Sequence, residues 1–140
     1  EAMNVSHAIV NKFRSKKDTS NILGIIGDTE GKRVAIITDD ETVTGGSLLN
    51  ATEQLYNNFN IDEIYVAVSH MKVKEKYIPR IIEAHEKCGL KEFHITDTIP
   101  QKESVRALDF VIQHSIAQRF AGTINRMHYN QSISKLFLSV

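Results

Sequence analysis

The sequence of 140 residues contains one cysteine, two prolines and no tryptophan. Because Cys88 is alone, no intrachain disulfide can form, which argues against a disulfide-stabilised secreted scaffold. Lys and Arg together number 17, as do Asp and Glu, so the formal net charge is zero. The chain therefore lacks the excess of positive charge that is typical of nucleic-acid-binding proteins.

Long apolar runs are missing as well. No segment approaches the ~18 residues of a membrane-spanning helix, and the N-terminus lacks the charged and apolar regions of a signal peptide. These absences predict a cytoplasmic protein with neither a membrane nor a nucleic acid as its partner. Apolar residues make up 41% of the chain, which is enough for a core. No linker rich in Pro or Gly divides it, so we expect one domain over residues 1–140.

Short apolar runs alternate with helical patterns along the chain. Strands are expected over 7–10, 22–27, 34–38, 64–68 and 93–96, helices over 48–59, 77–88 and 116–127, and a loop over 14–21, whereas 108–112 fits either a strand or a helix. The run 34–38 is typical of a strand covered on both faces. This order predicts an α/β fold, with a mainly parallel sheet and helices on both faces. Ligands of such folds bind at the carboxyl ends of the strands.

The segment after strand 34–38 carries the most chemistry. Asp39 and Asp40 offer acceptor-only carboxylates, which suit two neighbouring hydroxyls of a sugar, or a cation. The sequence TGGS at 44–47 then opens a helix, where glycines permit close approach of a ligand and free N–H groups favour a phosphate. A ligand with two neighbouring hydroxyls and a phosphate would match these groups, and ribose 5-phosphate is such a ligand. The plainer alternative is that Ser47 only caps the helix and the carboxylates form a solvated turn.

A second interpretation of the acidic pair is a receiver domain of two-component signalling. Such domains also place acidic residues after a strand, but they need a phospho-acceptor Asp at the end of a later strand. Here strand 64–68 is followed by Ser69 and His70. The sequence therefore favours the sugar-phosphate site over the receiver domain.

The pattern resembles the ribose-binding loop of the type I phosphoribosyltransferase fold. Further segments narrow the resemblance to the ribose-phosphate pyrophosphokinase family: IIGD at 25–28, DTIPQ at 97–101, SISKLF at 132–137 and AIVNKFR at 8–14. The resemblance implies the C-terminal half of that enzyme, in a homo-oligomer. In the family, much of the ATP site comes from other parts and from a neighbouring subunit.

The resemblance also implies a reaction and roles for residues. The diphosphate of ATP, the co-substrate, is transferred to O1 of ribose 5-phosphate, which gives phosphoribosyl diphosphate and AMP. Lys12 and Arg14 would contact the transferring phosphates. Asp39 and Asp40 would hold the ribose hydroxyls, with Mg²⁺ bridging substrate oxygens. The loop that would cradle the 5-phosphate consists of Val43, Thr44, Gly45, Gly46 and Ser47. No residue is assigned as a direct metal ligand, and His70 is a candidate to line the site.

Three departures from the family pattern leave two alternatives open. Val43 stands where the family usually has Asp, Phe13 stands where it usually has a basic residue, and residues 71–76 replace a Gly-containing loop. One alternative is a catalytically silent subunit that regulates active ones. The other is a phosphoribosyltransferase that consumes phosphoribosyl diphosphate, although no segment clearly supplies the hood that would cover a base.

Overall fold

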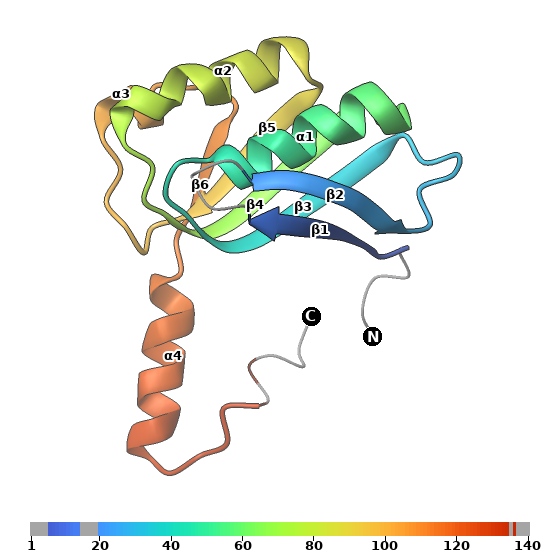
Figure 1. The fold of residues 1–140 in the computed structure, drawn as a ribbon. Helices are drawn as coiled ribbons and strands as arrows, with labels where there is room; N and C mark the ends of the chain where they lie inside the picture. The colour runs from blue at the N-terminus through green and yellow to red at the C-terminus, as the bar shows by residue number, and fades with distance from the viewer. Residues whose placement is uncertain (1–5, 15–19, 135, 137–140) are drawn as a thin grey trace.

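The computed structural model describes residues 6–14, 20–134 and 136, and for residues 10–14 and 20–24 it describes the backbone alone (Figure 1). The chain opens with an antiparallel pair of strands, β1 (Ala8–Arg14) and β2 (Ser20–Gly27). The expected loop over 14–21 is therefore too long, because Arg14, Ser20 and Asn21 belong to the strands. The remainder of that loop, residues 15–19, lies outside the described residues.

The main sheet is parallel throughout. Its strands are β3 (Val34–Thr42), β4 (Glu63–Met71), β5 (Leu90–Thr96) and β6 (Val111–His114), in the order β3-β4-β5-β6. β6 resolves the ambiguous stretch 108–112, of which only the last two residues join the sheet. A parallel sheet needs crossover connections, and helices supply them here. The predicted α/β fold with a mainly parallel sheet is confirmed.

Helices α1 (Gly46–Phe59) and α2 (Ile78–Lys87) cover one face of this sheet (Figure 1). A short 3₁₀ helix, η1 (Glu75–Tyr77), precedes α2. Pro79 lies in the first turn of α2, as expected. The apolar stripes of both helices meet the covered face of the sheet. The largest fully buried apolar side chains are Phe93, Leu49, Ile64, Met71, Ile81, Leu90, Ile95 and Val66.

The opposite face of the sheet is open at β3. Val34 is 52% and Ile36 is 60% exposed, and burial alternates along the strand. The expectation that the run 34–38 is covered on both faces is therefore wrong for the described residues. The apolar run reflects β propensity as well as burial, because β-branched side chains also favour a pleated surface with one solvated face.

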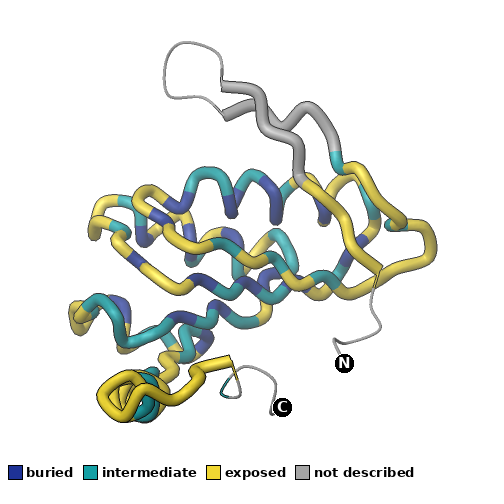
Figure 2. The backbone as a smooth tube through the Cα atoms, turned by 90° about the horizontal axis from the view of Figure 1, so that it is seen from below, coloured by how far each residue is buried: buried dark blue, intermediate teal, exposed yellow. Residues whose placement is uncertain are grey.

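Helix α4 (Ala117–His128) follows the sheet and a short helix, α3 (Glu103–Arg106). It points away from the sheet, and its residues are exposed or half-buried (Figures 1 and 2). Phe120, Ile124 and Met127 are 57%, 63% and 64% exposed. The helix itself was predicted correctly, but among the described residues its apolar stripe does not enter the core. No described helix is both long and apolar enough to cross a membrane.

Candidate functional site

The β3–α1 loop is held by its own hydroxyl groups. Thr42 is 7% exposed, and its Oγ1 accepts a hydrogen bond of 3.1 Å from the Gly45 N–H. Oγ1 of Thr44 accepts one of 3.2 Å from the Gly46 N–H. Gly45 is the N-cap residue of α1 and has φ +73°, a left-handed conformation that glycine adopts without steric cost. Ser47 is therefore not the N-cap, and the plainer interpretation of that residue is wrong.

This conformation leaves the start of α1 open to an anion. The N–H groups of Ser47 and Leu48 lie in the first turn, where no helix carbonyl precedes them to accept a hydrogen bond. The positive end of the helix dipole adds to them. Val43 and Thr44 are exposed beside this opening. The loop thus has the features of a phosphate site, and the assignment of its residues remains a prediction.

Asp39 and Asp40 lie within β3, because the strand runs to Thr42 rather than to Thr38, and they precede Val43 by four and three residues. Oδ1 of Asp39 accepts the Asp40 N–H at 3.0 Å, and Oδ1 of Asp40 accepts the Glu41 N–H at 2.8 Å. The Glu41 N–H is the largest cause that lowers the pKa of Asp40, followed by a hydrogen bond with Asp39. The charge of His70 contributes further. Asp40 is therefore ionised at neutral pH and turned toward its own strand end.

The end of β4 lies beside these carboxylates. Strand register places His70 opposite Glu41 and Val68 opposite Asp39. Ser69 and His70 belong to β4, which continues to Met71, so they do not follow the strand as predicted. The structure nevertheless brings His70 to the same edge of the sheet as Asp40, as the prediction requires.

The segment DTIPQ at 97–101 supports this edge. Oγ1 of Thr98 lies 2.9 Å from Nδ1 of His70 and donates to the Ser69 carbonyl at 2.8 Å. The side chain of Gln101 donates to the Met71 carbonyl at 2.9 Å. The segment 97–101, one of those that carry the family resemblance, therefore holds the end of β4 by hydrogen bonds.

Residues 71–76, which depart from the family pattern, also contact the acidic strand end. Nζ of Lys72 lies 2.6 Å from Oε2 of Glu41, and the Lys72 N–H donates to the Thr42 carbonyl at 2.8 Å. Both partners of the ion pair are about half exposed, which limits its contribution to stability. Its effect is local: it places a positive charge at the acidic strand end.

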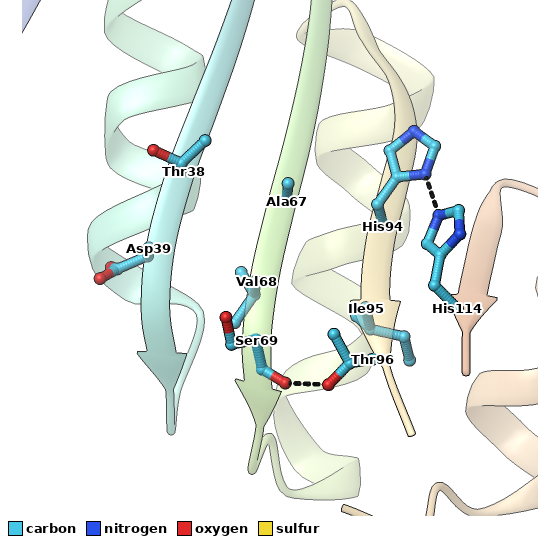
Figure 3. A pocket seen from close by; sticks show the side chains of 9 residues that line it. All are labelled: Thr38, Asp39, Ala67, Val68, Ser69, His94, Ile95, Thr96 and His114. Atoms are coloured by element: carbon cyan, nitrogen blue, oxygen red, sulfur yellow. Dashed lines mark hydrogen bonds between the residues drawn. The ribbon is translucent and has the colours of Figure 1, made fainter. Parts of the chain in front are cut away.

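Figure 3 shows a shallow depression on the open side of the sheet. Its lining consists of Thr38, Asp39, Ala67, Val68, Ser69, His94, Ile95, Thr96 and His114. Only Asp39 belongs to the predicted ribose-phosphate site. The depression and the predicted ribose-phosphate site are thus two different features that share Asp39.

Lys12 and Arg14, which are predicted to contact the transferring phosphates, belong to a different strand from the other predicted site residues. Lys12 and Arg14 are in β1, but their side chains lie outside what the structure describes. Their roles stay predictions. Of the segment at 132–137, Lys135 and Phe137 also lie outside the described residues.

Arg80 was missed by sequence analysis. Its Nη1 lies 3.8 Å from the position that a Cβ on Gly46 would occupy, and its Nη2 forms an ion pair of 3.3 Å with Glu53. A guanidinium at this distance from the loop adds positive charge beside the phosphate opening. No sequence spacing signals this, because Arg80 comes from α2 and reaches the loop only when α2 packs beside α1.

The acidic pair is compatible with Mg²⁺. Each carboxylate uses Oδ1 for a backbone N–H, and neither forms an ion pair with a described residue. The described residues hold no group of three or more His, Cys, Asp or Glu that could bind a metal. Mg²⁺ is commonly held by one or two carboxylates together with substrate phosphates and water. Asp39 and Asp40 fit that arrangement.

Comparisons with known proteins agree with this picture. Residues 2–138 match the family model described as phosphoribosyl synthetase-associated domain. A protein named ribose-phosphate pyrophosphokinase from Caldanaerobacter subterraneus subsp. tengcongensis is 38% identical over 137 residues, which are 98% of this chain and 41% of that protein. Its namesake from Fusobacterium nucleatum subsp. nucleatum is 34% identical over 137 residues, again 98% of this chain and 41% of the relative.

A solved structure is also similar. The crystal structure of phosphoribosylpyrophosphate synthetase from Mycobacterium smegmatis aligns with a TM-score of 0.64 and 27% identity, over 82% of this chain and 35% of that one. The chain thus spans well under half the length of the relatives it matches. The resemblance inferred from the sequence is confirmed at the level of the family. With nearly the whole chain inside the match, the protein belongs to the phosphoribosyl synthetase-associated domain family.

Proposed function

We propose that this chain is the ribose 5-phosphate-binding part of a ribose-phosphate diphosphokinase. The observation that carries the proposal is the β3–α1 segment, in which two carboxylates precede a glycine turn at the N-terminus of a helix. One end of this segment accepts hydrogen bonds and the other donates them. Ribose 5-phosphate has hydroxyls at one end and a phosphate at the other, so its polarity matches that of the segment.

In this proposal the sugar hydroxyls donate to Asp39 and Asp40. The lowered pKa of Asp40 supports the role, because an ionised carboxylate is the stronger acceptor. The 5-phosphate accepts from the N–H groups of Ser47 and Leu48 and from the hydroxyls of the loop. Val43 contributes only backbone, so its departure from the family pattern removes one acidic side chain and leaves the phosphate contacts intact.

The reaction joins O1 of ribose 5-phosphate to the β-phosphorus of ATP. The bond between that phosphorus and the bridging oxygen to the α-phosphorus breaks, and AMP leaves with the electron pair. The proton of the O1 hydroxyl is released. Lys12 and Arg14 would neutralise the transferring phosphates, as a point charge and a planar fork respectively. When bound, Mg²⁺ supplies charge neutralisation between substrate oxygens.

We further propose that the chain corresponds to the C-terminal half of the longer relatives and acts in a homo-oligomer. The order of the segments supports this, since DTIPQ at 97–101 and SISKLF at 132–137 follow the loop as they do in the family. The relatives are more than twice as long as the matched region. The remaining contacts to ATP would come from outside this chain.

A second candidate is a silent subunit that regulates active ones. The observation that favours it is the ion pair between Lys72 and Glu41, which places a cation at the acidic strand end. Lys72 lies in the segment 71–76 that departs from the family pattern. The four retained residues Lys12, Arg14, Asp39 and Asp40 favour the catalytic proposal.

AMP formation from ATP, ribose 5-phosphate and Mg²⁺ tests the proposal, measured on the full natural chain. We expect Lys12→Ala to lower turnover by about 10²-fold or more. The matched control is Lys32→Ala, because Lys32 forms an exposed ion pair of 3.6 Å with Asp28, away from the loop. Absent turnover with intact ribose 5-phosphate binding would favour the regulatory subunit, and absent binding would contradict both candidates.

A further inference from the structure

Arg80 reaches the start of α1 from a neighbouring helix. It lies in the first turn of α2, which packs beside α1 on the covered face of the sheet (Figure 1). Nη2 of its guanidinium donates to Oδ1 of Asn50 at 2.5 Å and lies 3.3 Å from Oε1 of Glu53. Gly46, Asn50 and Glu53 follow one another at helical spacing, so they share one face of α1. The guanidinium therefore lies along that face, with Nη1 on the side of Gly46.

Two hydrogen-bond donors bound the space beside Gly46. A Cβ at this position would lie 3.3 Å from Oγ1 of Thr44 and 3.8 Å from Nη1 of Arg80, so glycine leaves open a space that a side chain would fill. Oγ1 of Thr44 accepts the Gly46 N–H, and its own hydroxyl proton has no acceptor among the described residues. Nη1 of Arg80 likewise forms no hydrogen bond with a described residue. Both groups are therefore available to donate to one anion in this space.

The guanidinium supplies what the backbone of the loop lacks. The N–H groups of Ser47 and Leu48 carry partial charges, whereas Arg80 carries a full positive charge and donors in a fixed planar arrangement that suits phosphate oxygens. Its side chain is less than half exposed, which weakens the screening of that charge by water. The ion pair with Glu53 uses Nη2, so it holds the guanidinium in place without occupying Nη1.

We propose that Arg80 is a phosphate-binding residue, and that its Nη1 donates to an oxygen of the 5-phosphate of ribose 5-phosphate beside the Thr44 hydroxyl. This inference rests on the proposed function, because it assigns a further contact to the same site. The family resemblance does not imply it, since Arg80 lies outside each segment that carries the resemblance. The expected consequence is selectivity for a phosphorylated sugar over the uncharged one.

A nuclear magnetic resonance titration of the full chain with ribose 5-phosphate in Mg²⁺ tests the role of Arg80. We expect Arg80→Gln to weaken binding by about tenfold or more, because a hydrogen bond between two charged groups is lost. Arg80→Lys should bind with intermediate affinity, since an ammonium keeps the charge but not the fork. The guanidinium N–H resonances that are missing from Arg80→Lys should shift in the wild type as ribose 5-phosphate is added. At saturation, the amides of Asp39 and Asp40 should shift in Arg80→Gln as in the wild type, because the sugar end is unchanged.

Glu53→Gln separates the guanidinium from its ion pair. A glutamine oxygen can still accept from Nη2, so Arg80 stays in place while the negative charge beside it is removed. We expect this variant to bind ribose 5-phosphate at least as tightly as the wild type. Arg33→Gln is the surface control, because Arg33 pairs with Asp62 where β3 and β4 begin, at the opposite edge of the sheet from the loop. Urea midpoints should stay near the wild-type value in all variants, since exposed and half-exposed ion pairs add little stability.

The outcomes separate this inference from the proposed function. Wild-type binding with an unchanged affinity in Arg80→Gln would overturn the role of Arg80 and leave the proposed function standing. Equal weakening in Glu53→Gln and Arg80→Gln would overturn it as well, because the loss would then come from the ion pair. Guanidinium resonances that do not shift in the wild type would have the same meaning, even if a variant failed to fold. Absence of ribose 5-phosphate binding in the wild type would contradict both.

Discussion

Nδ1 of His70 lies 2.9 Å from Oγ1 of Thr98, which joins the end of β4 to the turn after β5. Thr98 uses its single hydroxyl proton to donate to the Ser69 carbonyl at 2.8 Å. With that proton engaged, the Thr98 oxygen accepts from His70, and we therefore predict that Nδ1 of His70 carries the hydrogen. Nε2 is then left to face the solvent or a ligand at the acidic strand end.

Replacing Thr98 by Val should remove this constraint on the His70 ring. We expect the wild-type protein to show the Nδ1–H tautomer at high pH in nitrogen-15 spectra of the ring. Thr98→Val should show a mixture of tautomers, because the hydrogen bond that selects one, worth about 1 kcal/mol, is gone. Thr123→Val, on α4, is the matched control. An identical ring spectrum in Thr98→Val would contradict the assignment.

The left-handed turn at Gly45 predicts a stability difference between two glycines. Gly45 and Gly31 have φ +73° and +67°, so an alanine at either position is strained by about 1–2 kcal/mol. A Cβ on Gly45 would also lie 3.3 Å from Cδ1 of Leu49, whereas one on Gly31 would meet nothing within 4 Å. We expect Gly45→Ala to unfold at lower urea concentration than Gly31→Ala. The reverse order would show that the loop conformation is wrong.

Asp97 predicts an acid-sensitive start of α4. Its pKa is lowered from 3.8, first by the Ser115 hydroxyl and next by the Ile116 N–H. Because the pKa of Asp97 is lower in the folded state, the ionised carboxylate stabilises the fold. This stabilisation is fully present above the ordinary pKa of 3.8. It is lost as the pH falls below about 3.8 through the folded pKa.

We therefore expect the urea midpoint of wild-type protein to fall more steeply between about pH 4 and about pH 2 than that of Asp97→Asn. Other carboxylates, Asp40 and Glu75 among them, also have lowered pKa values, but both proteins share them. The difference between the two profiles isolates Asp97. Parallel profiles would mean that the carboxylate does not hold the start of the helix.

Replacing a large side chain by alanine should lower the free energy of unfolding far more on the covered face of the sheet than on the open face. Phe93 is fully buried on the covered side, and Phe93→Ala should cost about 3–5 kcal/mol of unfolding free energy. Ile36 is 60% exposed on the open side, and Ile36→Ala should stay within about 0.5 kcal/mol. Chemical denaturation of both variants checks this. A large cost at Ile36 would show that this face is covered in solution.

Sequence patterns predicted the centres of the main-sheet strands better than their ends. β3 and β4 extend to Thr42 and Met71 because their ladder continues through Glu41 and His70. These polar residues are held in strands by backbone pairing, which hydrophobic periodicity does not reveal. The same periodicity predicted helix α4, yet its stripe does not enter the core, because an amphipathic pattern shows which face is apolar and not what covers it.

The candidate site was predictable where its residues are contiguous. Residues 39–47 come from one strand, its loop and the start of one helix, so their order in the sequence is also their order in space. Arg80, Lys72 and Thr98 reach this edge from other elements through tertiary packing. Single-sequence patterns carry no signal for such approaches.

A nuclear magnetic resonance titration of this chain with ribose 5-phosphate in Mg²⁺ tests the central claim most directly. We expect saturable shifts at the amides of residues 39–48, strongest at Ser47 and Leu48, and their loss in Gly46→Val. A Cβ on Gly46 would lie 3.3 Å from Oγ1 of Thr44 and 3.8 Å from Nη1 of Arg80, so valine fills the phosphate opening. Gly122→Val, in α4, should bind as the wild type does. Shifts confined to other residues, or equal binding by Gly46→Val, would show that ribose 5-phosphate does not bind at the β3–α1 segment.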